Sequence, residues 1–276
     1  MFGIILSGFS ALFHEIATAI GKYEVGARKE SVFTMGFLNY VWALLFFVVL
    51  IFLRDSFVFS FASLPTFTVR ALLEILQTHS SLVGVVRADR TTFSFVNIIT
   101  IPFLLLVDIV LGYKVGGLQL FGIGSIFIAL LVLFLRHDLK KDGLGFVLFS
   151  SINAVATISL FKYNITHFNS VEAEQTIIIA ILLFYLFFCA KFFAKENPIK
   201  FFKKPMFFLQ SASSGVGTVA ASFAFLFAPA SVITAAKRSF TIIWSWLSGS
   251  VYFHEGHVAI KFFAMSFLIL GVILLV

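Results

Sequence analysis

Apolar runs of about 20 residues follow one another along almost the whole chain, and only short polar connections separate them. Of the 276 residues, 60% are hydrophobic and 12% are charged. Water-soluble domains carry about 25% charged residues, so most of this chain's outer surface is expected to face lipid. The runs lack the alternation of apolar and polar residues that strands of a membrane barrel show. The sequence therefore predicts an all-α integral membrane protein.

Ten runs have the size of a membrane-crossing helix. Such a helix needs about 20 apolar residues at a rise of about 1.5 Å each. The runs lie at residues 3–20, 31–53, 65–85, 91–111, 117–135, 143–161, 170–190, 205–227, 230–251 and 258–276. No connection between them is long enough for a soluble domain. We expect a multi-pass protein with ten transmembrane helices.

An internal repeat divides the chain into two halves. Lys22 recurs as Lys162 and Pro65 recurs as Pro205, at an offset of about half the chain. Such matches keep their order from the first run to the fifth, which indicates two homologous units of five helices. The two units are residues 1–138 and residues 139–276. Because five is odd, the second unit must cross the membrane in the opposite direction, and inverted repeats of this kind are typical of secondary transporters.

Basic residues are concentrated in the connections on one side of this predicted bundle. Cytoplasmic loops carry the excess of Lys and Arg in membrane proteins. This distribution predicts that both termini lie outside the cytoplasm. The loop 191–204, with five Lys, is expected to contact anionic lipid headgroups.

Two adjacent cations, Lys237 and Arg238, interrupt the ninth run. Lys237 lies about 12 Å along that helix, close to the middle of the membrane. Each such cation opposes insertion by about 2.5–3.5 kcal/mol, so a lipid-facing position is disfavoured. Successive residues are about 100° apart on a helix, so both side chains can point into one central cavity. There they offer an anionic substrate two charges and the planar fork of Arg.

The alternative for these cations is an ion pair with acidic residues of the bundle. Glu15 lies in the first run and Glu74 in the third. Arg70 and Glu74 are four residues apart and therefore share a face on which they can pair. Glu15 is then the main acidic partner for Lys237 and Arg238, and the sequence leaves both hypotheses open.

The third run is the second polar helix, with Arg70, Glu74 and Gln77 at spacings of three to four residues. We expect this stripe to face the same cavity, although a buried network that only joins helices explains Gln77 equally well. Trp244 is expected to line a wall of the cavity. The candidate substrate-binding residues are therefore Lys237, Arg238, Arg70, Glu74, Glu15, Gln77 and Trp244.

Small residues four positions apart predict close helix packing, as in Ser211 with Gly215 and Gly217 with Ala221.

Metal and covalent chemistry have little support in the sequence. Cys189 is the single cysteine, which excludes disulfides within the chain and thiolate clusters. His254, Glu255 and His257 lack the spacing that puts two metal ligands on one helical face. The runs contain no recognisable pair of a catalytic nucleophile and its general base. We expect no cofactor, no metal and no enzymatic activity.

The segment APASVITAAKRSFTIIWSWLSGSVYFHE, residues 228–255, and the two five-helix halves resemble the ten-helix, EamA-like part of the drug/metabolite transporter superfamily. The resemblance covers nearly the whole chain. The pair Lys237 and Arg238 also looks like the adjacent Lys and Arg with which the related triose-phosphate translocators hold a phosphate. The resemblance implies transport by alternating access. It also implies cytoplasmic termini, opposite to the loop charges, so the orientation stays open.

The sequence therefore predicts a secondary transporter of a small organic anion, phosphorylated metabolites among them. An exporter of amino acids or other amphipathic metabolites is the nearest alternative, and a flippase for lipid-linked phosphate is another. The expected partners are a small-molecule substrate and membrane lipids, without nucleic acid, and a homodimer is left open. The expected location is the plasma (inner) membrane.

Overall fold

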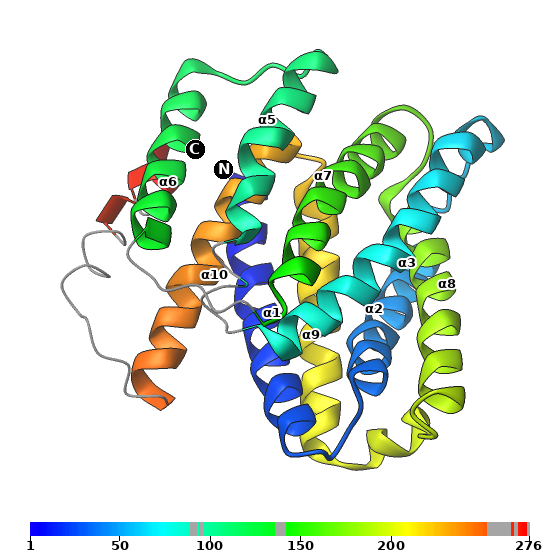
Figure 1. The fold of residues 1–276 in the computed structure, drawn as a ribbon. Coiled ribbons are helices and arrows are strands. Elements are labelled where there is room, and N and C mark those ends of the chain that lie inside the picture. The colour runs from blue at the N-terminus through cyan, green and yellow to red at the C-terminus, as the bar shows by residue number, and fades with distance from the viewer. Residues whose placement is uncertain (89–92, 94–95, 136–141, 253–265, 268–269, 275–276) are drawn as a thin grey trace.

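Helices make up every regular element in the described part of the chain (Figure 1). The computed structural model describes residues 1–88, 93, 96–135, 142–252, 266–267 and 270–274. The α-helices are α1 (Phe2–Gly26), α2 (Val32–Arg54), α3 (Leu64–Arg87), α5 (Thr100–Val110), α6 (Gly117–Leu135), α7 (Leu144–His167), α8 (Val171–Phe192), α9 (Pro205–Ala224) and α10 (Ala230–Tyr252). Short 3₁₀ helices are η1 (Phe61–Ser63), η2 (Asn97–Ile99) and η3 (Pro198–Lys203). The predicted all-α class is confirmed.

Among the described residues, four helices, α1, α2, α7 and α8, are long and apolar enough to cross a membrane, with mean hydropathies of 1.5, 2.4, 1.9 and 2.1. The helices α3, α9 and α10 have 24, 20 and 23 residues, which is also sufficient length, but they carry more polar side chains. The polar helices can cross a bilayer only where neighbouring helices shield them from lipid. The predicted span 258–276 lies mostly outside the described residues. The chain thus has the character of a membrane protein.

Within the predicted span 91–111, the described residues Phe93 and Val96 are helical, Asn97–Ile99 form the 3₁₀ turn η2, and α5 begins at Thr100. The α-helix is therefore interrupted before Thr100. Pro102 explains this interruption, since proline lacks an N–H and its ring clashes with the carbonyl four residues before it. There the Asn97 amide donates to the Phe93 carbonyl at 2.7 Å and the Thr100 hydroxyl donates to the Asn97 carbonyl at 2.6 Å.

The helices pack in pairs that join the two halves of the sequence. The helix α1 packs against α9 and α10, α2 against α8 and α9, α3 against α7, and α5 against α10 and α7. Figure 1 shows α1 and α9 side by side along most of their length. The first half of the chain is therefore held by the second half more than by itself.

Glycines on α9 make its close contacts possible. A Cβ at Gly215 would lie 2.8 Å from the Cβ of Trp42 and 2.9 Å from the backbone nitrogen of Ala43. A Cβ at Gly217 would lie 3.0 Å from Nδ1 of His14. Real Cβ atoms essentially never come as close as the distances at Gly215, and the distance at Gly217 is tighter than most real contacts. The predicted role of these two glycines in helix packing is therefore confirmed.

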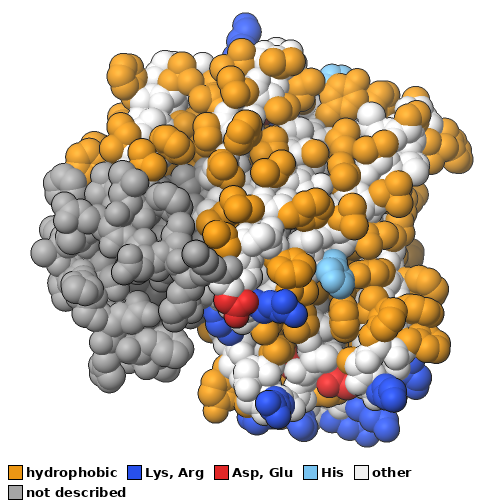
Figure 2. Space-filling model, in the orientation of Figure 1, with side chains coloured by type: hydrophobic (Ala, Val, Ile, Leu, Met, Phe, Trp, Pro, Cys, Tyr) orange, Lys and Arg blue, Asp and Glu red, His pale blue; other side chains and the backbone are white. Residues whose placement is uncertain are grey.

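The surface separates apolar from basic residues. Figure 2 shows hydrophobic side chains over most of one face, with Lys and Arg gathered at the lower end. The connections α1–α2 and α8–α9 meet at this end, which we call the Lys-rich end. Its exposed basic residues are Arg28, Lys29, Lys191, Lys195, Lys200, Lys203 and Lys204.

Candidate functional site

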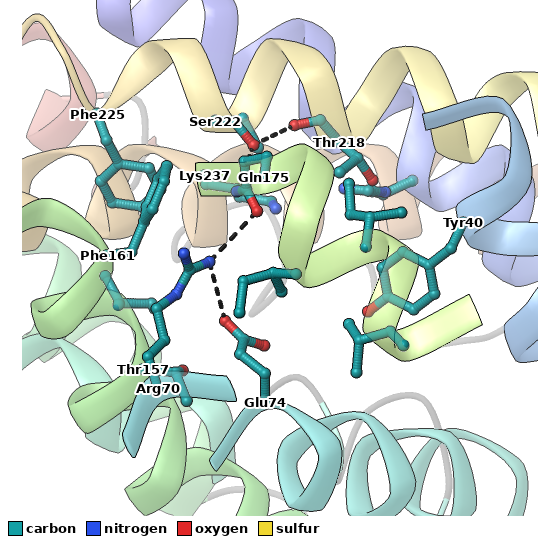
Figure 3. Close-up of a pocket in the computed structure, with 16 residues that line it drawn as sticks. Tyr40, Arg70, Glu74, Thr157, Phe161, Gln175, Thr218, Ser222, Phe225 and Lys237 are labelled. Atoms are coloured by element: carbon teal, nitrogen blue, oxygen red, sulfur yellow. Dashed lines mark hydrogen bonds and ion pairs between the residues drawn. The ribbon is translucent and has the colours of Figure 1, made fainter. Parts of the chain in front are cut away.

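A cavity of about 220 Å³ lies inside the bundle, between α1, α2 and α3 of the first half and α7 to α10 of the second (Figure 3). Its polar lining residues are His14, Tyr40, Arg70, Glu74, Thr157, Gln175, Thr218, Ser222 and Lys237. Its apolar lining residues are Ile158, Phe161, Ile178, Ile179, Leu182, Ala221 and Phe225. The cavity therefore combines charged and hydroxyl groups with an aliphatic and aromatic wall.

Arg70 on α3 is a cation of this cavity whose charge is already neutralised. Its Nη1 donates to Oε1 of Glu174 at 2.7 Å, and its Nη2 donates to Glu74 and Gln175 at 3.3 Å each. The guanidinium also lies 4.5 Å from the ring centroid of Phe161. The predicted pairing of Arg70 with Glu74 is confirmed. Of its three guanidinium nitrogens, only Nε has no hydrogen-bond partner among the described residues. With 2% of its surface exposed, Arg70 offers little access to an anionic ligand.

Glu174, the strongest partner of Arg70, is a residue that the sequence analysis missed. Its side chain is fully buried and accepts hydrogen bonds from the amides of Asn164 at 2.8 Å and Asn169 at 2.5 Å. It lies in the first turn of α8, after the N-cap Ser170. Acidic residues are common in that position because they complement the helix dipole, so its sequence context carried no functional signal.

Lys237 on α10 is the other cation of the cavity, and its situation differs from that of Arg70. Its backbone carbonyl accepts from the Thr241 hydroxyl at 2.8 Å. Its ammonium group makes no hydrogen bond or ion pair with any residue that the structure describes. Figure 3 shows the Lys237 side chain at the cavity, on the same side as Gln175 and Ser222. A half-buried ammonium without a carboxylate partner is an attractive position for an anionic ligand.

Arg238 points to another part of the bundle. Its Nη2 donates to Oδ1 of Asn97 at 3.2 Å, and the same oxygen accepts from the Ser151 hydroxyl at 3.2 Å. Arg238 is not among the residues that line the cavity. The two cations that the sequence places in one cavity are therefore separated here, because consecutive positions on a helix point in directions about 100° apart.

The remaining candidates join helices rather than line the cavity. Gln77 on α3 donates to the Ser150 hydroxyl at 3.0 Å and accepts from the Asn153 amide at 3.1 Å, both on α7. Trp244 donates from its indole nitrogen to the Gly8 carbonyl of α1 at 3.3 Å. Glu15 is buried on α1, 8% exposed, and lies outside the lining of the cavity. The structure thus brings Lys237, Arg70 and Glu74 together and places Arg238, Gln77, Glu15 and Trp244 elsewhere.

Metal ligands are not grouped in the part of the chain that the structure describes, where no set of three or more His, Cys, Asp or Glu is placed to hold an ion. The segment with His254, Glu255 and His257 lies outside the described residues.

Comparisons with known proteins inform the fold. No protein-family model matches the chain, and no curated protein matches it in sequence. The structure resembles 25 chains of solved structures. One crystal structure superposes with a TM-score of 0.71 at 12% sequence identity, over 98% of this chain and 95% of the other. The fold of the whole chain therefore recurs in proteins with very different sequences.

Proposed function

We propose that this chain is a secondary transporter that moves a small organic anion across a membrane by alternating access. The observation that carries the proposal is the ammonium group of Lys237, which faces a cavity inside the bundle without an acidic partner among the described residues. An unpaired charge that is partly removed from water opposes folding unless a ligand or a counter-ion compensates it. A substrate anion that binds for part of the transport cycle would supply this compensation.

The proposed architecture is ten transmembrane helices in two inverted repeats, residues 1–138 and 139–276. In that arrangement α1 is equivalent to α7, α2 to α8, α3 to α9, and α5 to α10. The contact of α1 with α9 then has its counterpart in that of α3 with α7, and α1 with α10 in α5 with α7. This correspondence supports the repeat, which the sequence matches suggested independently. A cavity between the halves is also where inverted-repeat transporters bind their substrates.

The size and lining of the cavity favour a substrate with one anionic group and an apolar part. A volume of about 220 Å³ suits a small metabolite. Arg70 is neutralised by Glu174 and Glu74, so Lys237 is the cation available for the anion. Ile178, Phe225 and the other apolar lining residues would contact the rest of the molecule. A carboxylate or a phosphate monoester satisfies these conditions.

A zwitterionic substrate such as an amino acid is a second candidate, and Glu74 is the observation that favours it. Its side chain is 19% exposed, and its ion pair with Arg70 is the longer of the two at 3.3 Å. Glu74 could therefore accept a substrate ammonium while Lys237 binds the carboxylate. This is the chemistry of the amphipathic exporters that the sequence analysis kept as an alternative.

Membership of the EamA-like drug/metabolite transporters remains part of this proposal. The helical fold and the sequence of α10 support it. The likeness to triose-phosphate translocators concerns two adjacent cations. Lys237 faces the cavity, as that likeness requires, whereas Arg238 donates to Asn97 and does not line the cavity. We place the Lys-rich end on the cytoplasmic side of the plasma (inner) membrane, since positive charge marks that side.

A ligand screen tests the proposal. The purified chain is heated in detergent with carboxylates, phosphorylated metabolites, nucleotide sugars and amino acids. A ligand at 100 times its dissociation constant should add about 2.7 kcal/mol to the stability of the folded state. Lys237→Met should abolish this stabilisation, whereas the matched control Lys200→Met, at an exposed position on η3, should retain it. If the wild type gains no stability from any anion or zwitterion, the proposal is wrong.

A further inference from the structure

The Lys-rich end of the molecule is held together by a contact between two connections that are distant in sequence. Glu196, which follows α8, accepts a hydrogen bond from the backbone nitrogen of Ser31 at 3.0 Å and another from the Thr34 hydroxyl at 2.5 Å. Ser31 is the N-cap of α2. The carboxylate of Glu196 thus binds the first turn of α2, where the helix dipole favours a negative charge.

Glu30 is buried next to this contact, and its carboxyl group forms no ion pair with any of the described residues. Only 3% of the surface of Glu30 is exposed to solvent. Neither carboxyl oxygen makes a hydrogen bond with any of the described residues. A carboxylate removed from water without a hydrogen bond or a cation is strongly destabilised, whereas the neutral acid is tolerated.

The charges around Glu30 add to this effect. Glu24 on α1 and Glu196 are the charged groups that act on it, and both are acidic. Lys29, the neighbouring cation, is engaged by Glu24 at 3.2 Å. The neutral amide of Gln210 on α9 faces Glu30 and acts in the opposite direction. Burial, reinforced by Glu24 and Glu196 and partly offset by Gln210, raises the pKa of Glu30 to about 8.

The helices α1, α2 and α9 are also tightly packed near Glu30. The Ser211 hydroxyl of α9 donates to the Leu38 carbonyl of α2, and the Gln210 amide donates to Asn39 at 3.4 Å. A Cβ at Gly21 of α1 would lie 2.7 Å from the sulfur of Met35. Water reaches Glu30 only if the packing at this end loosens.

We propose that Glu30 is a proton-binding site, and that its neutral form keeps α2 attached to Glu196 while its ionised form releases this end of the bundle. We call the group of Glu30, Glu196, Ser31 and Thr34 the latch. An ionised Glu30 would be a third negative charge beside Glu24 and Glu196, and it would draw water into the space between the two connections. The inference goes beyond the proposed function, because its ligand is the proton and it needs no knowledge of the substrate.

Hydrogen–deuterium exchange of the full chain in lipid nanodiscs tests the latch between pH 5.5 and 9.5. After correction for intrinsic exchange rates, peptides covering 27–34 and 193–200 report its opening. The wild type should lose protection by up to tenfold per pH unit until about pH 8 and then level off. Glu30→Gln, which mimics the neutral form, should stay protected throughout. The control Glu172→Gln, which removes a carboxylate near the opposite end of α8, should behave like the wild type.

Two outcomes would overturn the inference. One is a Glu30→Gln variant that loses protection with pH as the wild type does. The other is a Glu30→Gln variant that unfolds at a lower temperature than the wild type at pH 9, because the neutral side chain should then be the more stable one. Lys237→Met should keep the pH-dependent opening, so a failure of the latch is distinguishable from a failure of the transport proposal.

Discussion

Arg70 on α3 and Glu174 on α8 form an ion pair of 2.7 Å in which both side chains are almost fully buried. Asn164 and Asn169 donate to the same carboxylate, and Glu74 and Gln175 accept from the same guanidinium. Such pairs contribute to stability only when further hydrogen bonds satisfy the two groups, because each charge loses its hydration on burial. Here Nε of Arg70 is the guanidinium nitrogen that has no partner among the described residues. This network links α3 of the first half to α7 and α8 of the second.

Removal of one partner from this pair should destabilise the protein strongly. We expect Glu174→Gln to lower the free energy of unfolding by about 3–5 kcal/mol, because Arg70 would keep its buried charge with only Glu74, at 3.3 Å, as an acidic partner among the described residues. The control is Glu172→Gln, whose partner Arg54 is 57% exposed; its effect should be about 0–1 kcal/mol. Thermal unfolding in detergent measures both. Equal effects of the two substitutions would contradict this account.

The two adjacent cations of α10 should respond differently to substitution. Lys237→Met should remove ligand binding and leave the unliganded protein at least as stable as the wild type, because the ammonium has no partner among the described residues. Arg238→Met should keep ligand binding and lower stability, because it leaves Asn97 with one donor fewer. Ligand titration and unfolding of the same samples separate the two effects. If both variants lose binding to the same extent, both side chains contact the ligand in the bound state, which would contradict the separate roles assigned here.

A substitution at Gly215 tests how tightly α9 packs against α2. Gly215→Ala should lower the stability by about 1–3 kcal/mol, because its Cβ would overlap the backbone of Ala43 and the Cβ of Trp42. Gly145 on α7 is the matched control, since a Cβ there meets nothing within 4 Å. Gly145→Ala should be neutral or stabilising by up to about 1 kcal/mol through helix propensity. A neutral Gly215→Ala would show that α2 and α9 can move apart at little cost.

The raised pKa of Glu30 predicts how the free energy of unfolding depends on pH. Its pKa in the folded protein is about 8, above the ordinary value of 4.5 for an exposed carboxyl group. The folded state therefore binds the proton more tightly than the unfolded state. The stabilisation from the neutral form should be complete below about pH 4.5 and should be lost progressively up to about pH 8. The unfolding temperature of the wild type, minus that of Glu30→Gln at the same pH, should fall over this range. A constant difference would contradict the assignment.

The sequence predicts the elements well because hydrophobicity and length are local properties. In the described part of the chain, most of the runs of about 20 apolar residues become helices close to the predicted positions. The small residues of α9 pack closely, as their spacing indicated. The 3₁₀ turn η2 before α5 is the clearest departure, and Pro102 accounts for it through a local clash that the apolar pattern does not register. The pairing of Arg70 with Glu74 was also predictable, since both lie on one helical face.

The contacts between distant helices were decided only by the tertiary structure. Glu174 reaches Arg70 across more than 100 positions of sequence, and Glu196 reaches Ser31 across 165. A charged residue within an apolar run predicts that the charge has a partner, because the free energy of an isolated charge within the membrane is too high. Which acceptor satisfies it depends on how helices rotate and pack against one another. For this reason the sequence determined that Lys237 and Arg238 need counterparts, and the fold decided that Arg238 bonds to Asn97 while Lys237 faces the cavity.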